Sequence, residues 1–235
     1  LPYVFSRWKA IGFLFQPKQR KNTQYKCLRS GLDPMNVETS CYALNKPFGV
    51  LSQFTDEGGH PGLGSLSLDL PKDVYPVGRL DRDSEGLILL SNDSSFIHEL
   101  LEPSNGHSRT YMVQVEGDVN SGQIGALKSP MDLRIKKQVH RTKSCEAKLL
   151  PTPVVEDRIP PIRERKSIPT NWLEITLTEG KNRQVRKMTA HVGLPTLRLI
   201  RTQIGGLSLD SLNLQSGALV LLSSEQIVHA LSARV

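Results

Sequence analysis

Cysteine is scarce in this sequence, and neither cysteine nor histidine occurs at the spacing of a metal-binding motif. The chain has three cysteines in 235 residues and six histidines, no two of them four positions apart. The sequence therefore predicts neither a disulfide framework nor a transition-metal site. So few cysteines, in an odd number, are typical of a reducing, cytoplasmic compartment.

Long apolar runs are also absent. No stretch approaches the roughly 18 apolar residues of a membrane-spanning helix, and the first nine residues, LPYVFSRWK, lack the apolar core of a signal peptide. Because the sequence does not begin with methionine, we expect a trimmed chain. Its length of 235 residues allows one large or two small domains, and its composition, 38% hydrophobic and 23% charged residues, is ordinary for a globular protein.

Acidic residues are missing from the first 32 positions, which hold seven lysines and arginines. A block of like charge is most often a solvated tail. This block also contains six aromatic residues, and aromatic rings stack on unpaired bases while cations hold the phosphate backbone. The sequence supports both interpretations of residues 1–38: a solvated tail, or a basic N-terminal arm, partly disordered, that contacts phosphates. Residues 39–235 are expected to form the folded domain.

Strand patterns outnumber helix patterns in residues 39–235 and do not alternate strictly with them. Alternating or apolar runs predict strands at 41–44, 50–52, 87–90, 111–116 and 172–177, and short strands between 197 and 222. Helical periodicity predicts helices at 94–101 and 184–191. The proline-rich segment 151–169 is expected to be an exposed loop or a hairpin tip. Together these features predict an α+β fold with a mixed, mainly antiparallel sheet flanked by helices and loops.

Two segments imitate ligand-binding motifs without completing them. The glycine-rich stretch 56–64 is neither a phosphate loop nor a dinucleotide fingerprint, so a surface loop is expected. The run Asp81-x-Asp83-x-Glu85-Gly86 resembles the first half of a calcium-binding loop, but Asn92 stands where the bidentate glutamate belongs. We expect no calcium site.

The same charged run, 78–86, leads directly into the apolar run 87–90. Asp81 stands between Arg79 and Arg82, whose positive charge lowers the pKa of a carboxylate and opposes the effect of burial. An ionised carboxylate at the edge of a buried sheet can act as a nucleophile and form a covalent intermediate. Charge pattern alone favours the alternative, a cluster of surface salt bridges.

Four motifs in a fixed order resemble those of the pseudouridine synthases, most closely the branch named RsuA-like. They are YxLNKPxG at 42–49, GRLDxxSxGL at 78–87, RTY at 109–111 and EGKNRQVRKM at 179–188, the last continued by LIRxxIG at 199–205. The matches span about 165 residues. Many members of this branch begin with a small RNA-binding domain, for which the basic arm is too short. The resemblance implies a pseudouridine synthase fold and makes residues 39–235 the catalytic domain.

The resemblance also implies roles for individual residues. Asp81 is the expected nucleophile, and Tyr111 stacks on a flipped-out uracil and helps to remove the proton from its carbon 5. Arg79 fills the place that the uridine leaves, or grips the flanking phosphate. Arg186 pairs with Asp81 and keeps it ionised. Weaker expectations are that Leu199 forms an apolar wall of the base pocket and that Lys46 and Arg183 contact phosphates. Asp83 and Glu85 are expected to have surface or loop-shaping roles.

The expected reaction converts uridine to pseudouridine in ribosomal RNA, namely the 23S RNA of the large subunit. It needs no cofactor, because reactant and product are isomers. We expect a monomer. Asp81 can attack the ribose carbon, promote its elimination or add to the uracil ring, and the sequence does not choose among these routes. Two other functions stay open: an RNA-binding assembly factor in which catalysis is dispensable, and a glycosidase that excises a flipped base.

Overall fold

The computed structural model describes residues 39–162, 165 and 167–232. The basic N-terminal arm predicted for residues 1–38 lies outside the described residues. The main sheet contains β1 (Cys41–Lys46), β2 (Tyr75–Val77), β3 (Glu85–Ser91), β4 (Arg109–Glu116), β7 (Glu146–Leu150), β8 (Thr170–Leu177), β9 (Thr196–Ile204), β10 (Leu207–Ser208) and β11 (Leu219–Leu221). A separate hairpin is formed by β5 (Asp132–Ile135) and β6 (Gln138–Arg141). The helices are α1 (Ser94–Leu101), α2 (Ser121–Lys128), α3 (Gln184–His191), α4 (Leu209–Leu212) and α5 (Ser224–Ser232).

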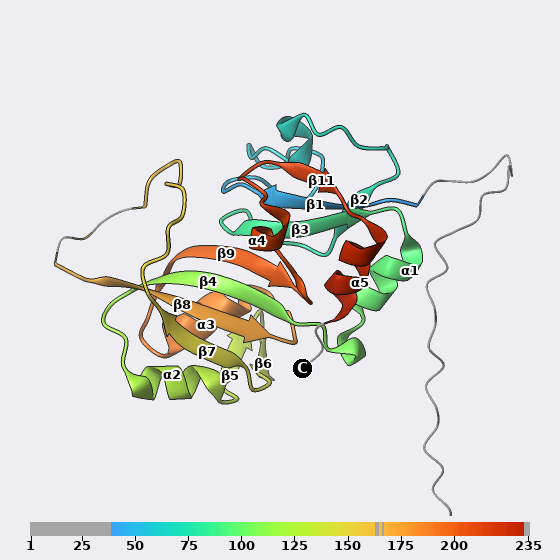
Figure 1. Cartoon of the computed structure of the whole chain (residues 1–235). Helices are drawn as coiled ribbons and strands as arrows, with labels where there is room; N and C mark the ends of the chain where they lie inside the picture. The colour runs from blue at the N-terminus through green and yellow to red at the C-terminus, as the bar shows by residue number, and fades with distance from the viewer. Residues whose placement is uncertain (1–38, 163–164, 166, 233–235) are drawn as a thin grey trace, which may run out of the picture. The chain divides into compact units, whose positions relative to one another are not determined.

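The main sheet is mixed and mainly antiparallel, as the sequence predicts. Its strand order is β11-β1-β3-β9-β4-β8-β7, with β2 paired to β3 and β10 paired to β9 (Figure 1). Within the described residues, β3 and β9 form the parallel pair. That pair requires a glycine at position 86, because a Cβ atom there would lie 2.3 Å from the backbone oxygen of Arg201. The two central strands therefore approach closely beside the charged run.

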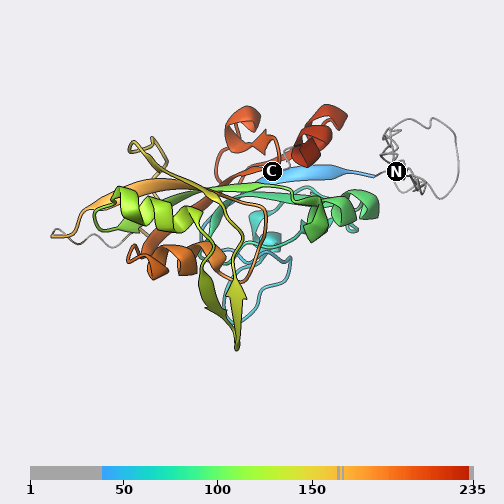
Figure 2. The same cartoon turned by 90° about the horizontal axis from the view of Figure 1, so that it is seen from below.

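Both faces of β3 are covered, which explains its continuous apolar sequence. Ile88 and Leu90 pack into one core cluster, while Leu87 and Leu89 pack into another with Phe96 of α1. Helices α4 and α5, red in Figure 2, lie on one side of the sheet, and α3, orange, lies on the other. The charged run thus enters a strand that is fixed from both sides.

The two predicted helices are confirmed with their boundaries. Asp93 caps α1 by accepting from two backbone N–H groups, and Pro103 follows its end. The predicted strands at 41–44, 87–90, 111–116 and 172–177 are confirmed within β1, β3, β4 and β8. Segment 151–169 joins the antiparallel neighbours β7 and β8, and its described residues contain neither helix nor strand. The prediction of a hairpin tip is therefore confirmed. No helix in the described part of the chain is long and apolar enough to cross a membrane.

The predicted strand at 50–52 is wrong. Leu51 donates its backbone N–H to the carbonyl of Pro61, and Ser52 exchanges hydrogen bonds with Leu80 through its hydroxyl. The segment is therefore held by loops rather than by a neighbouring strand. The strands expected between Leu197 and Leu222 are present as β9, β10 and β11, but β9 has nine residues and the short helix α4 follows β10.

Candidate active site

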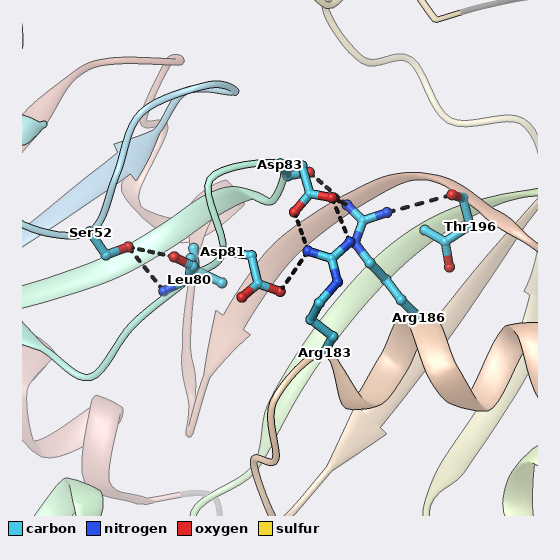
Figure 3. Close-up of polar contacts among 7 residues, drawn as sticks. All are labelled: Ser52, Leu80, Asp81, Asp83, Arg183, Arg186 and Thr196. Carbon is cyan, nitrogen blue, oxygen red and sulfur yellow. Dashed lines mark hydrogen bonds and ion pairs between the residues drawn. The ribbon is translucent and has the colours of Figure 1, made fainter. Parts of the chain in front are cut away.

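The loop between β2 and β3 turns Asp81 away from the core. Leu80 is buried, and its backbone donates to the Ser52 hydroxyl at 3.0 Å and accepts from it at 2.8 Å. The backbone N–H of Ser84 donates to the carbonyl of Asp81 at 3.0 Å and closes the turn. With Leu80 anchored inside, the Asp81 carboxylate points towards α3 and its preceding residue (Figure 3).

Two arginines of the EGKNRQVRKM motif meet this loop. Arg183 donates to both carboxylate oxygens of Asp83, at 2.8 and 2.7 Å, and reaches Oδ2 of Asp81 at 3.5 Å. Arg186 donates to the backbone carbonyl of Asp83 at 2.6 Å and lies 3.5 Å from its carboxylate (Figure 3). Asp83 is therefore the residue that both arginines hold.

These contacts change the ionisation of Asp83. Burial raises the pKa of its carboxyl, but the hydrogen bonds from Arg183 and the positive charges of both arginines outweigh burial and lower it. The pKa of Arg183 is raised in return, chiefly by its hydrogen bonds to Asp83. The pair is consequently ionised across the neutral pH range.

A cleft of about 460 Å³ opens beside Asp81. Tyr111 of β4, 9% exposed, and Leu199 of β9, 5% exposed, lie among its lining residues. Arg109 and Arg201 also line the cleft, and Arg109 is held by the carbonyls of His107 and Leu100. Burial, and then the neighbouring Arg201, lower the pKa of Arg109. The cleft thus combines a carboxylate, an aromatic ring and an apolar wall with positive charge.

The structure brings together most of the residues that the resemblance selects. The cleft is lined by Asp81, Arg79, Tyr111, Leu199 and Arg183. Arg79 is exposed, and within the described ranges its guanidinium forms neither a hydrogen bond nor an ion pair with another residue. Its side chain is therefore available to a bound molecule.

Two predicted contacts need correction. The expected pair of Arg186 with Asp81 is not formed: among the described residues, Arg183 is the cation paired with Asp81, and Arg186 binds Asp83. Lys46 is not a phosphate contact, because it is 0% exposed and its Nζ donates to the carbonyls of Pro47 and Val50. Its ammonium instead closes the turn after β1.

The surface role expected for Glu85 is also wrong. Glu85 is the first residue of β3, and its buried carboxylate accepts from Nε and Nη2 of Arg198 at 2.9 and 2.8 Å. Arg198 further donates to the carbonyl of Glu156, which attaches the β7–β8 connection to β9. An arginine inside the apolar run LRLIR at 197–201 was the available signal of a buried acidic partner.

Within the described ranges, three acidic side chains line the cleft, and they differ in their contacts. Glu102 accepts close hydrogen bonds from Ser104, and Glu179 accepts them from His140 and Gln184. Asp81 has only the 3.5 Å contact to Arg183 among the side chains of the described residues. The described residues also contain no group of three or more His, Cys, Asp or Glu side chains arranged to hold a metal ion. Asp81 is therefore the cleft carboxylate whose oxygens are most available to a bound molecule.

Comparison with known proteins relates this site to one family. The sequence profile described as RNA pseudouridylate synthase matches residues 40–191. A protein of Xanthomonas axonopodis pv. citri named ribosomal large subunit pseudouridine synthase E is 47% identical over 170 residues, 72% of this chain and 87% of the relative. A protein of the same name from Vibrio vulnificus is 44% identical over 177 residues, 75% of this chain and 73% of the relative. A crystal structure of a pseudouridylate synthase superposes with a TM-score of 0.66 at 25% identity, covering 82% of this chain and 74% of that one.

Proposed function

This chain belongs to the RNA pseudouridylate synthase family, and we propose that it isomerises a specific uridine of large-subunit ribosomal RNA with Asp81 as the nucleophile. The observation that carries the proposal is the shared cleft of Asp81, Tyr111 and Leu199. The names of the relatives support large-subunit RNA as the substrate.

The reaction rearranges one nucleoside and consumes nothing. The bond between ribose carbon 1′ and uracil nitrogen 1 breaks, the base turns, and carbon 1′ bonds to carbon 5 of the ring. The proton on carbon 5 leaves, and nitrogen 1 gains a proton, so atoms and electrons balance without a co-reactant. The protein must therefore supply a nucleophile, a proton acceptor and a pocket in which the freed base can turn.

The arginine contacts suit Asp81 for the nucleophilic role. A nucleophilic carboxylate must be ionised, yet it must not be locked in a tight ion pair. Arg183 lies 3.5 Å from Asp81 but 2.7 Å from Asp83, so the close hydrogen bonds of Arg183 are accepted by Asp83. Asp81 keeps a stabilising positive charge nearby while its oxygens stay available. Attack on the ribose, elimination and addition to uracil all require this state.

Access to the base requires that the uridine leave its helical stack, which costs a few kcal/mol. Arg79 is exposed at the cleft and takes the vacated place or the flanking phosphate. Tyr111 stacks on the extruded uracil and assists the removal of the carbon 5 proton, while Leu199 closes the apolar side of the pocket. Arg183, whose side chain is 42% exposed, contacts a phosphate at the rim. Arg186 contributes indirectly, because it fixes the loop between β2 and β3 through the carbonyl of Asp83.

The proposal is tested by incubating the purified chain with a transcript of large-subunit ribosomal RNA and measuring both pseudouridine and free uracil. We expect pseudouridine at one or a few positions, no free uracil and an RNA of unchanged mass. Release of uracil would identify a glycosidase instead. Binding of the transcript with neither product would identify an assembly factor without catalysis.

A further inference from the structure

The β5–β6 hairpin is a strongly basic element, and its residues are not among those that line the cleft. Residues 132–143, here called the basic hairpin, include five lysines and arginines and one acid. Ile135 pairs with Gln138, so Lys136 and Lys137 form a two-residue turn at the tip. The basic hairpin projects from the main sheet on the side that carries α3 (Figure 2).

Most cations of the basic hairpin have no acidic partner. Arg141 pairs with Asp132 at 3.1 Å. Arg134, Lys136, Lys137 and Lys143 are exposed, and within the described parts of the chain none of the four forms an ion pair. Holding several like charges on a narrow hairpin is unfavourable without counter-charges, so these cations are suited to an anionic partner.

The basic hairpin is fixed to the rim of the catalytic cleft through Glu179. The two carboxylate oxygens of Glu179 bind Nε2 of His140 and the backbone N–H of Lys143, both at 2.9 Å. Gln184 of α3 donates to the same carboxylate at 2.7 Å, and Glu179 itself lines the cleft. Burial raises the pKa of Glu179, but these hydrogen bonds together lower it, so the anchoring carboxylate is ionised.

The tip of the basic hairpin also has an unusual backbone. Lys136 has a φ of 55°, a left-handed conformation that glycine or asparagine adopts with less strain in two-residue hairpin turns. The tip therefore carries a positively charged residue at a position where glycine or asparagine would be less strained. Strained positions of this kind are found preferentially at functional sites.

We propose that the basic hairpin is an RNA-binding element that holds the sugar–phosphate backbone of the substrate beside the catalytic cleft. The inference rests on the proposed function, because a substrate seated in the cleft must continue past the rim at Glu179. RNA is the partner that fits, since exposed cations without acidic partners match a run of phosphates. The contacts are to phosphate and position the RNA without reading its sequence.

Substitution of the two tip lysines by glutamine tests the inference. Binding of a large-subunit ribosomal RNA transcript to K136Q/K137Q is measured at several salt concentrations, together with kcat at saturating RNA. The slope of log binding constant against log salt should become shallower by about 0.7 to 1 for each phosphate that the variant no longer binds. Affinity at low salt should fall on the order of tenfold, while kcat stays unchanged. Glutamine, like lysine, is not branched at Cβ, so the substitution adds no β-branched crowding to the turn.

Lys72→Gln is the matched control. Lys72 is an exposed lysine in the turn before β2, outside the residues that line the catalytic cleft. Its substitution removes one positive charge, half of what K136Q/K137Q removes, and should leave the salt slope unchanged. An unchanged slope for K136Q/K137Q, or an equal change for K72Q, would overturn the inference.

A wild-type chain that binds the transcript without forming pseudouridine would contradict the proposed function while leaving the difference between the slopes interpretable. If K136Q/K137Q keeps its RNA binding but loses binding to an acidic protein, the inference is overturned and the hairpin binds a different partner.

Discussion

The loop between β2 and β3 lines the cleft, and the basic hairpin is tied to the rim of the cleft through Glu179, but the two use charge differently. Asp83 of the loop holds Arg183, which precedes α3, and Arg186 within α3. In the basic hairpin, Lys136 and Lys137 have no acidic partner among the described residues. Paired charges fix a geometry, whereas unpaired cations remain available to a ligand. Changes in the loop should therefore lower turnover, and changes in the hairpin should weaken binding.

The largest effect is expected at Asp81, on the catalytic side of this contrast. Asp81→Asn should lower kcat for pseudouridine formation at least about a thousandfold, because an amide cannot act as the nucleophile. The variant should bind the RNA transcript within about twofold of wild type and unfold at the same denaturant concentration, since Asp81 makes a single long contact to a side chain of the described residues. Single-turnover kinetics measure the loss of turnover, and filter retention measures the binding of the RNA transcript. Residual turnover within tenfold of wild type would refute the role of Asp81.

The buried pair of Glu85 and Arg198 is a paired charge whose loss should lower the free energy of unfolding. Glu85→Gln leaves the Arg198 guanidinium buried without its counter-charge and should cost about 3–5 kcal/mol of unfolding free energy. The exposed pair of Arg141 and Asp132 is the control, where Arg141→Gln should cost less than about 1 kcal/mol. Denaturant unfolding measures both. Equal costs would show that burial does not decide the strength of these pairs.

Lys46 forms no ion pair with the described residues and is too buried to meet a ligand, so it gives a pH-dependent test of a third kind of cation. Burial lowers the pKa of its ammonium to about 8, while the unfolded chain keeps the proton up to about 10.5. The unfolded state therefore binds more protons between these pH values, and the free energy of unfolding rises with pH across this window. The gain from Lys46 is on the order of 3 kcal/mol at about 1.4 kcal/mol per pH unit. Unfolding measured from pH 8 to 10.5 should show this rise in wild type relative to Lys46→Met, and parallel curves would contradict it.

Asp83→Asn should produce a smaller catalytic effect, because it removes the carboxylate that holds Arg183 while Arg186 keeps its hydrogen bond to the backbone carbonyl of the substituted residue. Arg183 would then be free to pair closely with Asp81, and Arg186 would lose its neighbouring carboxylate. We expect kcat to fall roughly 10- to 100-fold, as is typical when a catalytic group is misplaced, with RNA affinity unchanged. Asp83→Glu, which keeps the charge, should recover part of the loss. A lower affinity with normal kcat would place Asp83 in RNA binding instead.

The sequence predicted the elements whose signals are local. Helix α1 has a capping aspartate and a terminating proline, and β3 has an uninterrupted apolar run, so both were found. The basic hairpin was missed because its turn is Lys136-Lys137 rather than the Asn-Gly or Asp-Gly that marks two-residue turns. Helix α2 was missed because two glycines and a weak apolar face obscure its period.

Side-chain partners were predicted less well than positions, because they depend on packing between distant segments. Three separate motifs selected Asp81, Tyr111 and Leu199, and the structure gathers these residues in one cleft. The motifs could not show that Arg186 binds Asp83 instead of Asp81, since these aspartates are only two residues apart in one loop. The resemblance suggested that Lys46 contacts phosphate, and Glu85 was assigned a surface or loop-shaping role, whereas the pairing of β1, β3 and β9 buries both.

The most direct test is a map of pseudouridine across ribosomal RNA from cells that lack this protein, complemented with wild type or with Asp81→Asn. At least one large-subunit position should lose pseudouridine, regain it with wild type and remain uridine with the variant. An unchanged map in the cells without the protein, or full restoration by Asp81→Asn, would contradict the assignment of Asp81 as the nucleophile of an RNA-modifying cleft.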